Sequence, residues 1–395
     1  MNIVERWMLP DGVEEILPDE AHQIEILRRQ ILDLFALWGY DLVFPPMLEF
    51  TESLLIGLGQ DLDLNTFKVV DQLSGRSMGI HADMTPQAAR MDAHSLKREG
   101  VSRLCYSGHV LYTRPKSALA TRTPFQVGVE LFGEAGIEAD IEIISLLLQT
   151  LKKAELADLC IDLGHVAIYR ALTKAVGLNQ EQENTLFNLL QAKAITDIRD
   201  WIEANVVDAK AKRWFSELPK LSGASNVIGF ARTLFADAPA NVAKALDELE
   251  HIADVIGERY PEAQLYFDLS ELRGYHYHTG VVFAAFAAGV GNEIASGGRY
   301  DHVGEVFGRS NRPATGFNAD LVALKRLGQP RCDMRNGIFA PLSQHLKFWS
   351  TVQSLREQGE RLIVGFDGQN LPKEFQNCDR KLIERDDAFV VEPLT

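Results

Sequence analysis

Apolar residues near the start of the chain follow the period of an α-helix. Downstream of Pro18 they recur at spacings of three and four residues: Ile24, Leu27, Ile31, Leu34 and Trp38. This spacing places the apolar side chains on one face of a helix, and the following Gly39 is a suitable residue to end it. We therefore expect an amphipathic helix that packs one face against a core.

The segment after this helix carries strand and turn signals. Residues 40–44 predict a strand that ends at a pair of prolines, and residues 66–81 predict a hairpin around Leu-Ser-Gly. Thr85 followed by Pro86 is a typical helix start, because threonine caps the first amides and proline fits the first turn. That helix is expected to run to about Lys97.

Strands and helices alternate in the rest of the first 328 residues. Residues 104–113 and 124–133 predict an antiparallel pair of strands, joined by the polar segment 114–122. Further helices are predicted at 137–156 and 319–327, and further strands at 159–165, 263–269, 281–286 and 292–298. Residues 179–260 are almost wholly helical in pattern, which indicates a helical subdomain inserted between strands.

A short linker divides the chain by composition. Residues 328–337 read GQPRCDMRNG, and the tail beyond them predicts the order strand, helix, strand, strand, at 337–341, 345–360, 361–366 and 387–393. We expect a larger domain over residues 1–328 and a small α/β domain over residues 329–395. The whole is predicted to be an α+β protein with an antiparallel sheet flanked by helices.

Charge and cysteine content narrow the class of protein. The formal net charge is −15, which argues against a broad nucleic-acid-binding face. The four cysteines are scattered and form no CxxC pair, so we expect neither a disulfide framework nor a cysteine zinc site, and a cytoplasmic protein. The N-terminus does not have the pattern of a signal peptide, and residues 280–291 are too short to cross a membrane.

The segment ELRGYHYHTG (residues 271–280) is unusual in composition. In a strand, Tyr275 and Tyr277 would face one side, and His276 and His278 the other. A metal site on the two histidines would need further ligands that the sequence does not offer. A pocket wall for a small polar ligand, with an arginine toward a carboxylate, is a second possibility. On spacing alone, a polar strand at a sheet edge is favoured.

Two other polar groups allow a structural and a functional interpretation. Asp83 and Thr85 precede or begin a predicted helix, where capping is their simplest role, although Asp83 could bind a ligand ammonium. Gln126 and Glu130 lie four residues apart on one face of a predicted apolar strand. Inward polar side chains are costly without partners, so this pair points weakly to a ligand site.

Taken in order, these segments resemble histidyl-tRNA synthetase, a class II aminoacyl-tRNA synthetase, over most of residues 8–328. The matching segments are LPDGVEEILPDEA at 9–21, FPPMLEF at 44–50, IHADMT at 80–85, FQVGVELFG at 125–133, RGYHYHTG at 273–280 and SGGRYD at 296–301. Each is modest alone, but together and in register they are specific. The resemblance implies the class II synthetase-like fold, with FPPMLEF as the dimer-forming motif 1.

The resemblance also implies a histidine-binding pocket, carried over position by position. Its residues in this chain are Asp83, Thr85, Gln126, Glu130, Arg273, Tyr277 and His278. In the family, the counterparts of Asp83 and Thr85 hold the substrate amino group, and that of Arg273 contacts the carboxylate. The counterparts of Tyr277 and His278 lie near the imidazole, although the family has a tyrosine in place of His278.

The chain departs from the synthetase pattern where the family binds ATP. In HVLYTRP (residues 109–115), Tyr112 stands where motif 2 carries the arginine that grips the α-phosphate, and Arg114 follows nearby. In GFNADLVA (residues 316–323), Ala323 occupies the place of the motif 3 arginine. Without both arginines, the positive charge that steadies the triphosphate during adenylation is lost.

A synthetase-like chain with this combination resembles the regulatory-subunit family of ATP phosphoribosyltransferase. That resemblance implies a non-catalytic protein without cofactor or metal. It implies a short-form catalytic subunit as partner, in a hetero-octamer of four plus four, with L-histidine as allosteric inhibitor of the first step of histidine biosynthesis. Two alternatives stay open: an active, divergent amino-acid-activating enzyme, and a dimeric scaffold whose pocket is vestigial.

Overall fold

Two units make up the chain. The computed structural model describes residues 7–55, 60–115, 120–309, 312–328, 330, 336–366, 377–386 and 388–394. Contacts divide the chain into Met1–Pro330, here the core unit, and Arg331–Thr395, the C-terminal unit. The predicted linker at 328–337 lies partly outside the described residues, so the exact domain boundary stays a prediction. The predicted connection at 114–122 also lies partly outside them.

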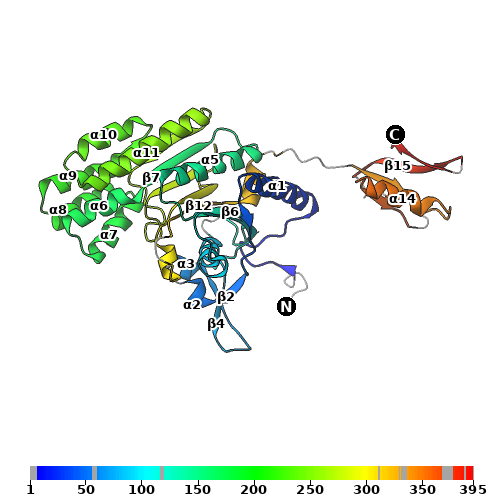
Figure 1. Ribbon diagram of the computed structural model, residues 1–395, viewed down its shortest axis with the longest axis horizontal. Helices are drawn as coiled ribbons and strands as arrows, with labels where there is room; N and C mark the ends of the chain where they lie inside the picture. The colour runs from blue at the N-terminus through cyan, green and yellow to red at the C-terminus, as the bar shows by residue number, and fades with distance from the viewer. Residues whose placement is uncertain are drawn as a thin grey trace. The chain divides into compact units, whose positions relative to one another are not determined.

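A sheet of nine described strands forms the framework of the core unit (Figure 1). In spatial order the strands are β1 (Asp41–Leu42), β5 (Ser102–His109), β6 (Phe125–Phe132), β12 (Ala314–Asp320), β11 (Ala295–Arg299), β10 (Val281–Phe286), β7 (Cys160–His165), β9 (Gln264–Asp268) and β8 (Ser222–Gly223). Only the pairs β1–β5 and β7–β9 are parallel. The sheet is therefore mixed but largely antiparallel, and the strand predicted at 40–44 is shorter than expected.

Helices cover one face of this sheet, and the alternation of side chains along each strand directs apolar residues toward them. On β6, Val127, Val129 and Leu131 join the main hydrophobic core, to which the helices α1 (Pro18–Leu37), α5 (Ile137–Lys153), α6 (Val166–Val176) and α13 (Leu321–Leu327) also contribute. Full burial of such a side chain stabilises the fold by about 1.5–3 kcal/mol. The residues between them, including Gln126 and Glu130, must then face the opposite side.

The opposite face is covered by a smaller layer. Helix α4 (Thr85–Arg90) packs there against β6. A separate three-stranded sheet has the order β2 (Leu48–Phe50), β4 (Ser77–Ile80) and β3 (Phe67–Val70), which confirms the predicted hairpin. The helix predicted to reach Lys97 is wrong in type beyond Arg90, because a π-helical turn follows at Met91–Leu96. Within that turn the buried Asp92 carboxylate pairs with Arg312 at 2.7 Å.

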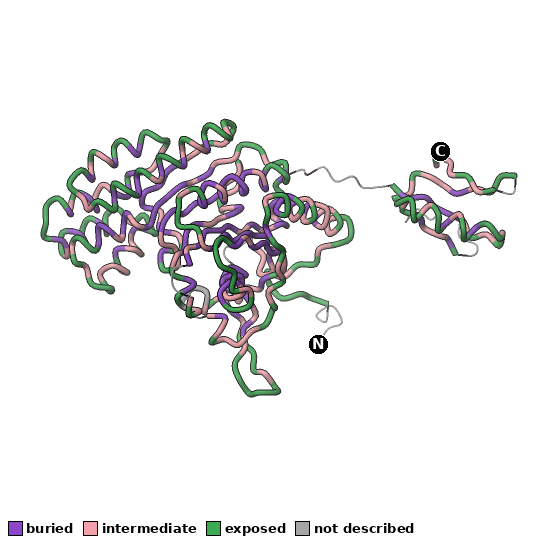
Figure 2. The backbone as a smooth tube through the Cα atoms, viewed as in Figure 1, coloured by how far each residue is buried: buried purple, intermediate pink, exposed green. Residues whose placement is uncertain are grey.

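The helical insertion is confirmed between β7 and β9. It comprises α7 (Gln180–Gln191), α8 (Ile195–Asn205), α9 (Ala209–Glu217), α10 (Asn226–Leu234) and α11 (Ala240–Arg259), with a 3-10 turn at Leu218–Lys220. Strand β8, within the insertion, was not predicted. Figure 2 shows buried residues following the strands of the large sheet, whereas exposed residues lie along the outer sides of these helices.

The C-terminal unit has its own small core. Its sheet has the order β14 (Leu362–Val364), β13 (Gly337–Ala340), β15 (Cys378–Arg385) and β16 (Ala388–Pro393), with α14 (Phe348–Glu357) supplying the core residues Phe348 and Val352. The predicted order of strand, helix, strand and strand omitted β15. That strand reads CDRKLIER, and its charged residues mask the alternation expected of a half-buried strand.

The described residues contain neither a membrane-spanning helix nor a disulfide bond. Within the described part of the chain, no helix is long and apolar enough to cross a membrane. Cys105, Cys160 and Cys378 are free thiols. Cys332 lies outside the described residues.

Candidate functional site

The segment from Glu271 to Gly280 forms a loop of turns, so its prediction as a strand is wrong. Gly274 has a left-handed φ of 61°, and its carbonyl accepts hydrogen bonds from the amides of Tyr277 (2.8 Å) and His278 (2.7 Å). These bonds fold the chain back on itself, which a strand cannot do. Alternating aromatic residues favour a strand locally, but one glycine in a left-handed conformation overrides that preference here.

This loop forms one wall of a cavity of about 350 Å³, here called the loop pocket. Its lining includes the start of α4, strand β6 and the loop itself, together with residues of α7, β11 and β12. The lining includes all seven residues singled out from the sequence: Asp83, Thr85, Gln126, Glu130, Arg273, Tyr277 and His278. The fold therefore brings together side chains that are up to 195 positions apart, counted from Asp83 to His278.

Two of these residues at the start of α4 have more than one role. The Asp83 carboxylate accepts a hydrogen bond from the Thr85 amide at 3.1 Å, in keeping with the capping role considered from the sequence. The Thr85 hydroxyl makes no cap; it lies 3.0 Å from the Tyr106 hydroxyl. Both side chains still line the loop pocket, so capping and ligand contact do not exclude one another.

Glu130 is the most strongly perturbed acid in the loop pocket. Its side chain is 1% exposed, and burial raises its pKa to about 8, against the effect of hydroxyl groups that donate to it. Tyr106 donates to one carboxylate oxygen at 2.9 Å and Tyr300 to the other. Gly316 lies directly opposite on β12, where a side chain would collide with this carboxylate. The glycine therefore makes room for the acid.

Among the described residues, two buried polar atoms of the loop pocket have no partner at full hydrogen-bond geometry, although Tyr300 lies close enough to the Tyr277 hydroxyl to act on its pKa. They are the amide oxygen Oε1 of Gln126, a residue that is 4% exposed, and the hydroxyl of Tyr277. Leaving such a group unpaired costs about 1–3 kcal/mol. A polar ligand that donated to the amide oxygen and bonded the hydroxyl would recover this cost, so both atoms indicate a binding site.

The loop adds a neutral imidazole and a guanidinium. His278 Nδ1 lies 3.3 Å from the Arg299 carbonyl, which can only accept, so the proton is on Nδ1 and Nε2 is free to accept. Burial lowers the pKa of His278 to about 4, which keeps the ring neutral. Among the described residues, Arg273 has one ion pair, to Glu271 at 3.4 Å; its guanidinium also lies 5.9 Å from the Phe286 ring centroid, and the residue lines the loop pocket.

Sequence reasoning missed several residues that complete the loop pocket. Tyr106 and Tyr300 hold the Glu130 carboxylate, and Phe187 of α7 lines the cavity from the helical insertion. A tyrosine in an apolar strand and a phenylalanine on an amphipathic helix carry no local sign of function. Tyr300 belongs to SGGRYD, one of the segments that resemble the family, and this was the available signal. The neighbouring Arg299 has a structural role, because its Nη2 pairs with the buried Asp140 at 2.6 Å.

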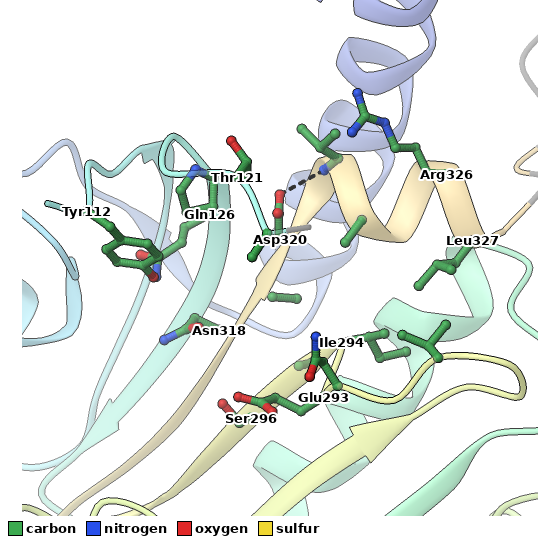
Figure 3. Close-up of a pocket in the computed structure, with 18 of the residues that line it drawn as sticks. Tyr112, Thr121, Gln126, Glu293, Ile294, Ser296, Asn318, Asp320, Arg326 and Leu327 are labelled. Carbon is green, nitrogen blue, oxygen red and sulfur yellow. Dashed lines mark hydrogen bonds between the residues drawn. The ribbon is translucent and has the colours of Figure 1, made fainter. Parts of the chain in front are cut away.

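A larger cavity of about 780 Å³, here called the chamber, adjoins the loop pocket and shares five lining residues with it: Tyr112, Gln126, Glu293, Ser296 and Asn318 (Figure 3). Ala323, at the place of the motif 3 arginine, lines it. Among its described lining residues one is basic, Arg326, and three are acidic: Glu14, Glu293 and Asp320.

The one described cation of the chamber is already neutralised. Arg326 donates to both carboxylate oxygens of Glu14, at 3.0 and 2.9 Å, and to Glu20 at 2.8 Å. Figure 3 shows Arg326 across the chamber from Tyr112 and Gln126. Burial also raises the pKa of Asp320 above its usual range. The chamber thus offers a triphosphate no free positive charge among these residues.

Comparisons with known proteins match a family profile to each of the two units of the chain. A profile of the histidyl-tRNA synthetase family matches residues 12–324, and a profile of the ATP phosphoribosyltransferase subunit HisZ C-terminal domain matches residues 335–392. The chain is 60% identical to an ATP phosphoribosyltransferase regulatory subunit of Teredinibacter turnerae and 57% identical to one of Saccharophagus degradans, with 100% of both chains covered in each case. The chain belongs to the ATP phosphoribosyltransferase regulatory subunit family. Its role is therefore regulatory, in histidine biosynthesis, and not catalytic.

Solved structures confirm the predicted class II synthetase-like fold. A crystal structure of an ATP phosphoribosyltransferase regulatory subunit/histidyl-tRNA synthetase from Bacillus halodurans C is 27% identical, with a TM-score of 0.81 over 94% of this chain and 95% of that one. Histidyl-tRNA synthetase from Nostoc sp. PCC 7120 is 18% identical, with a TM-score of 0.76 over 95% and 91% of the two chains. The second likeness shows the fold alone.

Proposed function

We propose that this regulatory subunit activates a short-form catalytic subunit of ATP phosphoribosyltransferase and inhibits it when L-histidine occupies the loop pocket. The observation that carries the proposal is the contrast between two adjoining cavities. The Tyr277 hydroxyl of the loop pocket, and the amide oxygen of Gln126 where the two cavities share a wall, have no described partner at full hydrogen-bond geometry, whereas the chamber has its one described cation paired internally.

The chemistry of the loop pocket suits free histidine. Carboxylates and an amide oxygen, from Asp83, Glu130 and Gln126, suit the ammonium group, with the Thr85 hydroxyl beside them. The Arg273 guanidinium suits the carboxylate. The Tyr277 hydroxyl and the accepting Nε2 of His278 suit an imidazole, which can present both a donor and an acceptor. A cavity of about 350 Å³ is in the range of small-molecule sites.

The chamber explains why bound histidine would be sensed and not activated. Adenylation requires cationic side chains beside the phosphates of ATP, where they stabilise the negative charge that shifts during the reaction. Here Tyr112 and Ala323 stand in place of two such cations, and Arg326 is held by two carboxylates. In this proposal the subunit needs no cofactor and no metal.

The proposed assembly has two interfaces, one between two copies of this chain and one with the catalytic subunit. Around motif 1, the core unit exposes the large apolar side chains Leu42, Phe44, Met47 and Leu48, of which Phe44 is 71% exposed. Such a patch favours association, and we propose that it forms a dimer with a second copy of this chain. From the family resemblance we further propose that four copies of this chain, as two such dimers, assemble with four catalytic subunits in a cytoplasmic hetero-octamer.

Inhibition requires a difference in histidine affinity between two states of the complex. A ligand shifts an equilibrium only by the difference between its free energies of binding to the two states. For allosteric effectors this coupling is typically about 1–3 kcal/mol. Histidine would therefore bind the less active state several-fold to a hundredfold more tightly than the more active state.

Reconstitution tests the proposal directly. A short-form catalytic chain is assayed alone, with this protein, and with this protein plus histidine. We expect the rate to rise on addition of the protein and to fall again with histidine. Unchanged rates with a co-purifying partner would refute it, as would robust histidine-dependent ATP–pyrophosphate exchange, because exchange is the signature of an amino-acid-activating enzyme.

A further inference from the structure

The loop at 271–280 has two sides that face different parts of the molecule. Toward the pocket, the Tyr277 ring stacks on Tyr300 with 4.7 Å between the ring centroids. Toward the helical insertion, the Tyr275 ring stacks on Phe187 of α7 at 5.3 Å, and His276 lies 5.3 Å from the same ring. One short loop thus touches both the ligand pocket and the insertion.

The contact with the insertion is chemically specific. The Tyr275 hydroxyl donates to the Glu183 carboxylate of α7. Arg170 of α6 donates to the Tyr275 carbonyl at 2.5 Å, and its guanidinium lies 4.8 Å from the Tyr275 ring centroid. Because the loop has no regular hydrogen-bond ladder of its own, these contacts fix the position of its backbone.

Helix α7 also reaches the pocket and the base of the loop. Leu186 and Leu190 are buried in the main core, whereas Phe187, on a different face, lines the loop pocket. Just after the helix, the Lys193 ammonium pairs with Asp268 at 2.7 Å, at the end of β9 that leads into the loop. The insertion therefore contacts the loop and its base at several points.

We infer that α7 of the helical insertion is coupled to the loop pocket through Glu183 and Phe187, so that histidine binding and the docking of α7 stabilise each other. This inference rests on the proposed function, since it takes histidine as the ligand. Glu183 is a positioning residue that holds Tyr275, and through it the loop that carries Tyr277 and His278. Phe187 also packs on Tyr275, and in addition lines the pocket itself. By linkage, any event that displaces α7 weakens histidine binding by the same factor that histidine opposes the displacement.

Single substitutions with matched controls give the first test. Phe187→Ala removes the stacked ring, and we expect histidine to bind about tenfold more weakly in calorimetry. The control is Phe230→Ala on α10 of the same insertion, a ring that is 64% exposed and outside the pocket, with no change in affinity expected. Equal affinities for the two variants would overturn the assignment of Phe187.

A double-mutant cycle separates coupling from general destabilisation. Tyr275→Phe and Glu183→Gln each weaken one hydrogen bond, so each should reduce histidine affinity by about threefold, and the double variant by no more than about threefold. Glu181→Gln, an exposed residue on the same helix, should leave the affinity unchanged. Additive losses in the double variant would show that the two residues do not act together, which would overturn the proposed coupling through Glu183.

Hydrogen exchange of the full-length chain, with and without L-histidine, tests the inference most completely when calorimetry is run on the same sample. We expect slower amide exchange in α7 on histidine addition, and less protection in Phe187→Ala at matched saturation. Binding heat with unchanged exchange in α7 would overturn the coupling alone. Absence of binding heat would overturn the proposed histidine site, and the coupling with it.

Discussion

The loop pocket and the chamber adjoin one another, yet they have kept different chemistry. Each has one arginine among its described lining residues, Arg273 and Arg326. Arg273 makes a single ion pair at 3.4 Å, whereas Arg326 is bonded by two carboxylates at 2.8–3.0 Å. The presence of a charge therefore does not identify a binding site. What identifies it is a set of hydrogen-bonding and charged groups that the described residues leave without strong partners.

Removal of the two arginines should separate the cavities most clearly. Arg273→Ala removes the proposed partner of the histidine carboxylate, and loss of a charge-assisted bond of about 2–3 kcal/mol should weaken histidine binding roughly a hundredfold. Arg326→Ala is the matched change in the chamber, with less than a twofold effect on histidine affinity expected. Calorimetry of both variants measures this. Similar losses in the two would erase the distinction between the cavities.

The pH dependence of histidine binding should depend on Glu130. Its pKa is about 8 in the free protein because of burial, and a bound ammonium would lower it, so binding releases a proton below pH 8. Affinity should therefore increase with pH by up to about tenfold per unit between pH 6 and 8 and level off above. Calorimetry in buffers of different ionisation enthalpy measures the released proton.

Glu130→Gln is the control for this effect. Titration of the imidazole of histidine itself contributes to both proteins near pH 6–6.5, so only the part that the variant loses belongs to Glu130. The same carboxyl should make the free protein less stable as pH rises from about 4.5 to 8, because the folded state holds a proton that the unfolded state releases. An unaltered pH profile in the variant would remove Glu130 from the site.

Tyr277→Phe should affect binding and stability in opposite directions. Its hydroxyl is buried and, among the described residues, has no partner at full hydrogen-bond geometry, so its removal should raise the free energy of unfolding by about 1 kcal/mol. Histidine should bind about fivefold more weakly, because the imidazole loses a hydrogen bond. Thermal unfolding and calorimetry test the two halves. A variant that was less stable and bound histidine equally well would mean that the hydroxyl has a structural role.

The smallest effect is expected from the chamber. Ala323→Arg restores a cation at the motif 3 position, but the lining carboxylates Glu14, Glu293 and Asp320 remain. Histidine affinity should change by less than twofold, and ATP–pyrophosphate exchange should stay absent. Exchange that appeared with this one change would show that the chamber is closer to an active adenylation site than its charges suggest.

The sequence predicted elements better than it predicted the loop. The helix at 18–37 and the hairpin at 67–80 follow from local periodicity and turn residues, which act over a few positions. The loop at 271–280 does not, because its fold depends on Gly274 and on Arg170 and Glu183, which are distant in sequence. Strand β15 was missed for a related reason, since its charged residues hide a half-buried pattern.

The full set of seven candidate residues came from the resemblance, whereas spacing alone pointed only weakly to a ligand site, through Gln126 and Glu130. Locally, a helix cap was the favoured role of Asp83, with binding of a ligand ammonium as the alternative, and its bond to the Thr85 amide is present. Its place in the loop pocket depends on strand pairing that brings β6 next to β5 and β12. Phe187 and Tyr106 were not foreseen, because an apolar residue that lines a pocket has the same local pattern as one that fills a core.

One measurement tests the central claim most directly: calorimetric titration of the isolated chain with L-histidine, followed by titration with ATP and magnesium. The account predicts saturable heat with one histidine per chain and no heat with ATP, before or after histidine is bound. Binding of ATP, or no binding of histidine, would contradict it, because the chamber would then be the functional cavity, or the loop pocket would be a remnant.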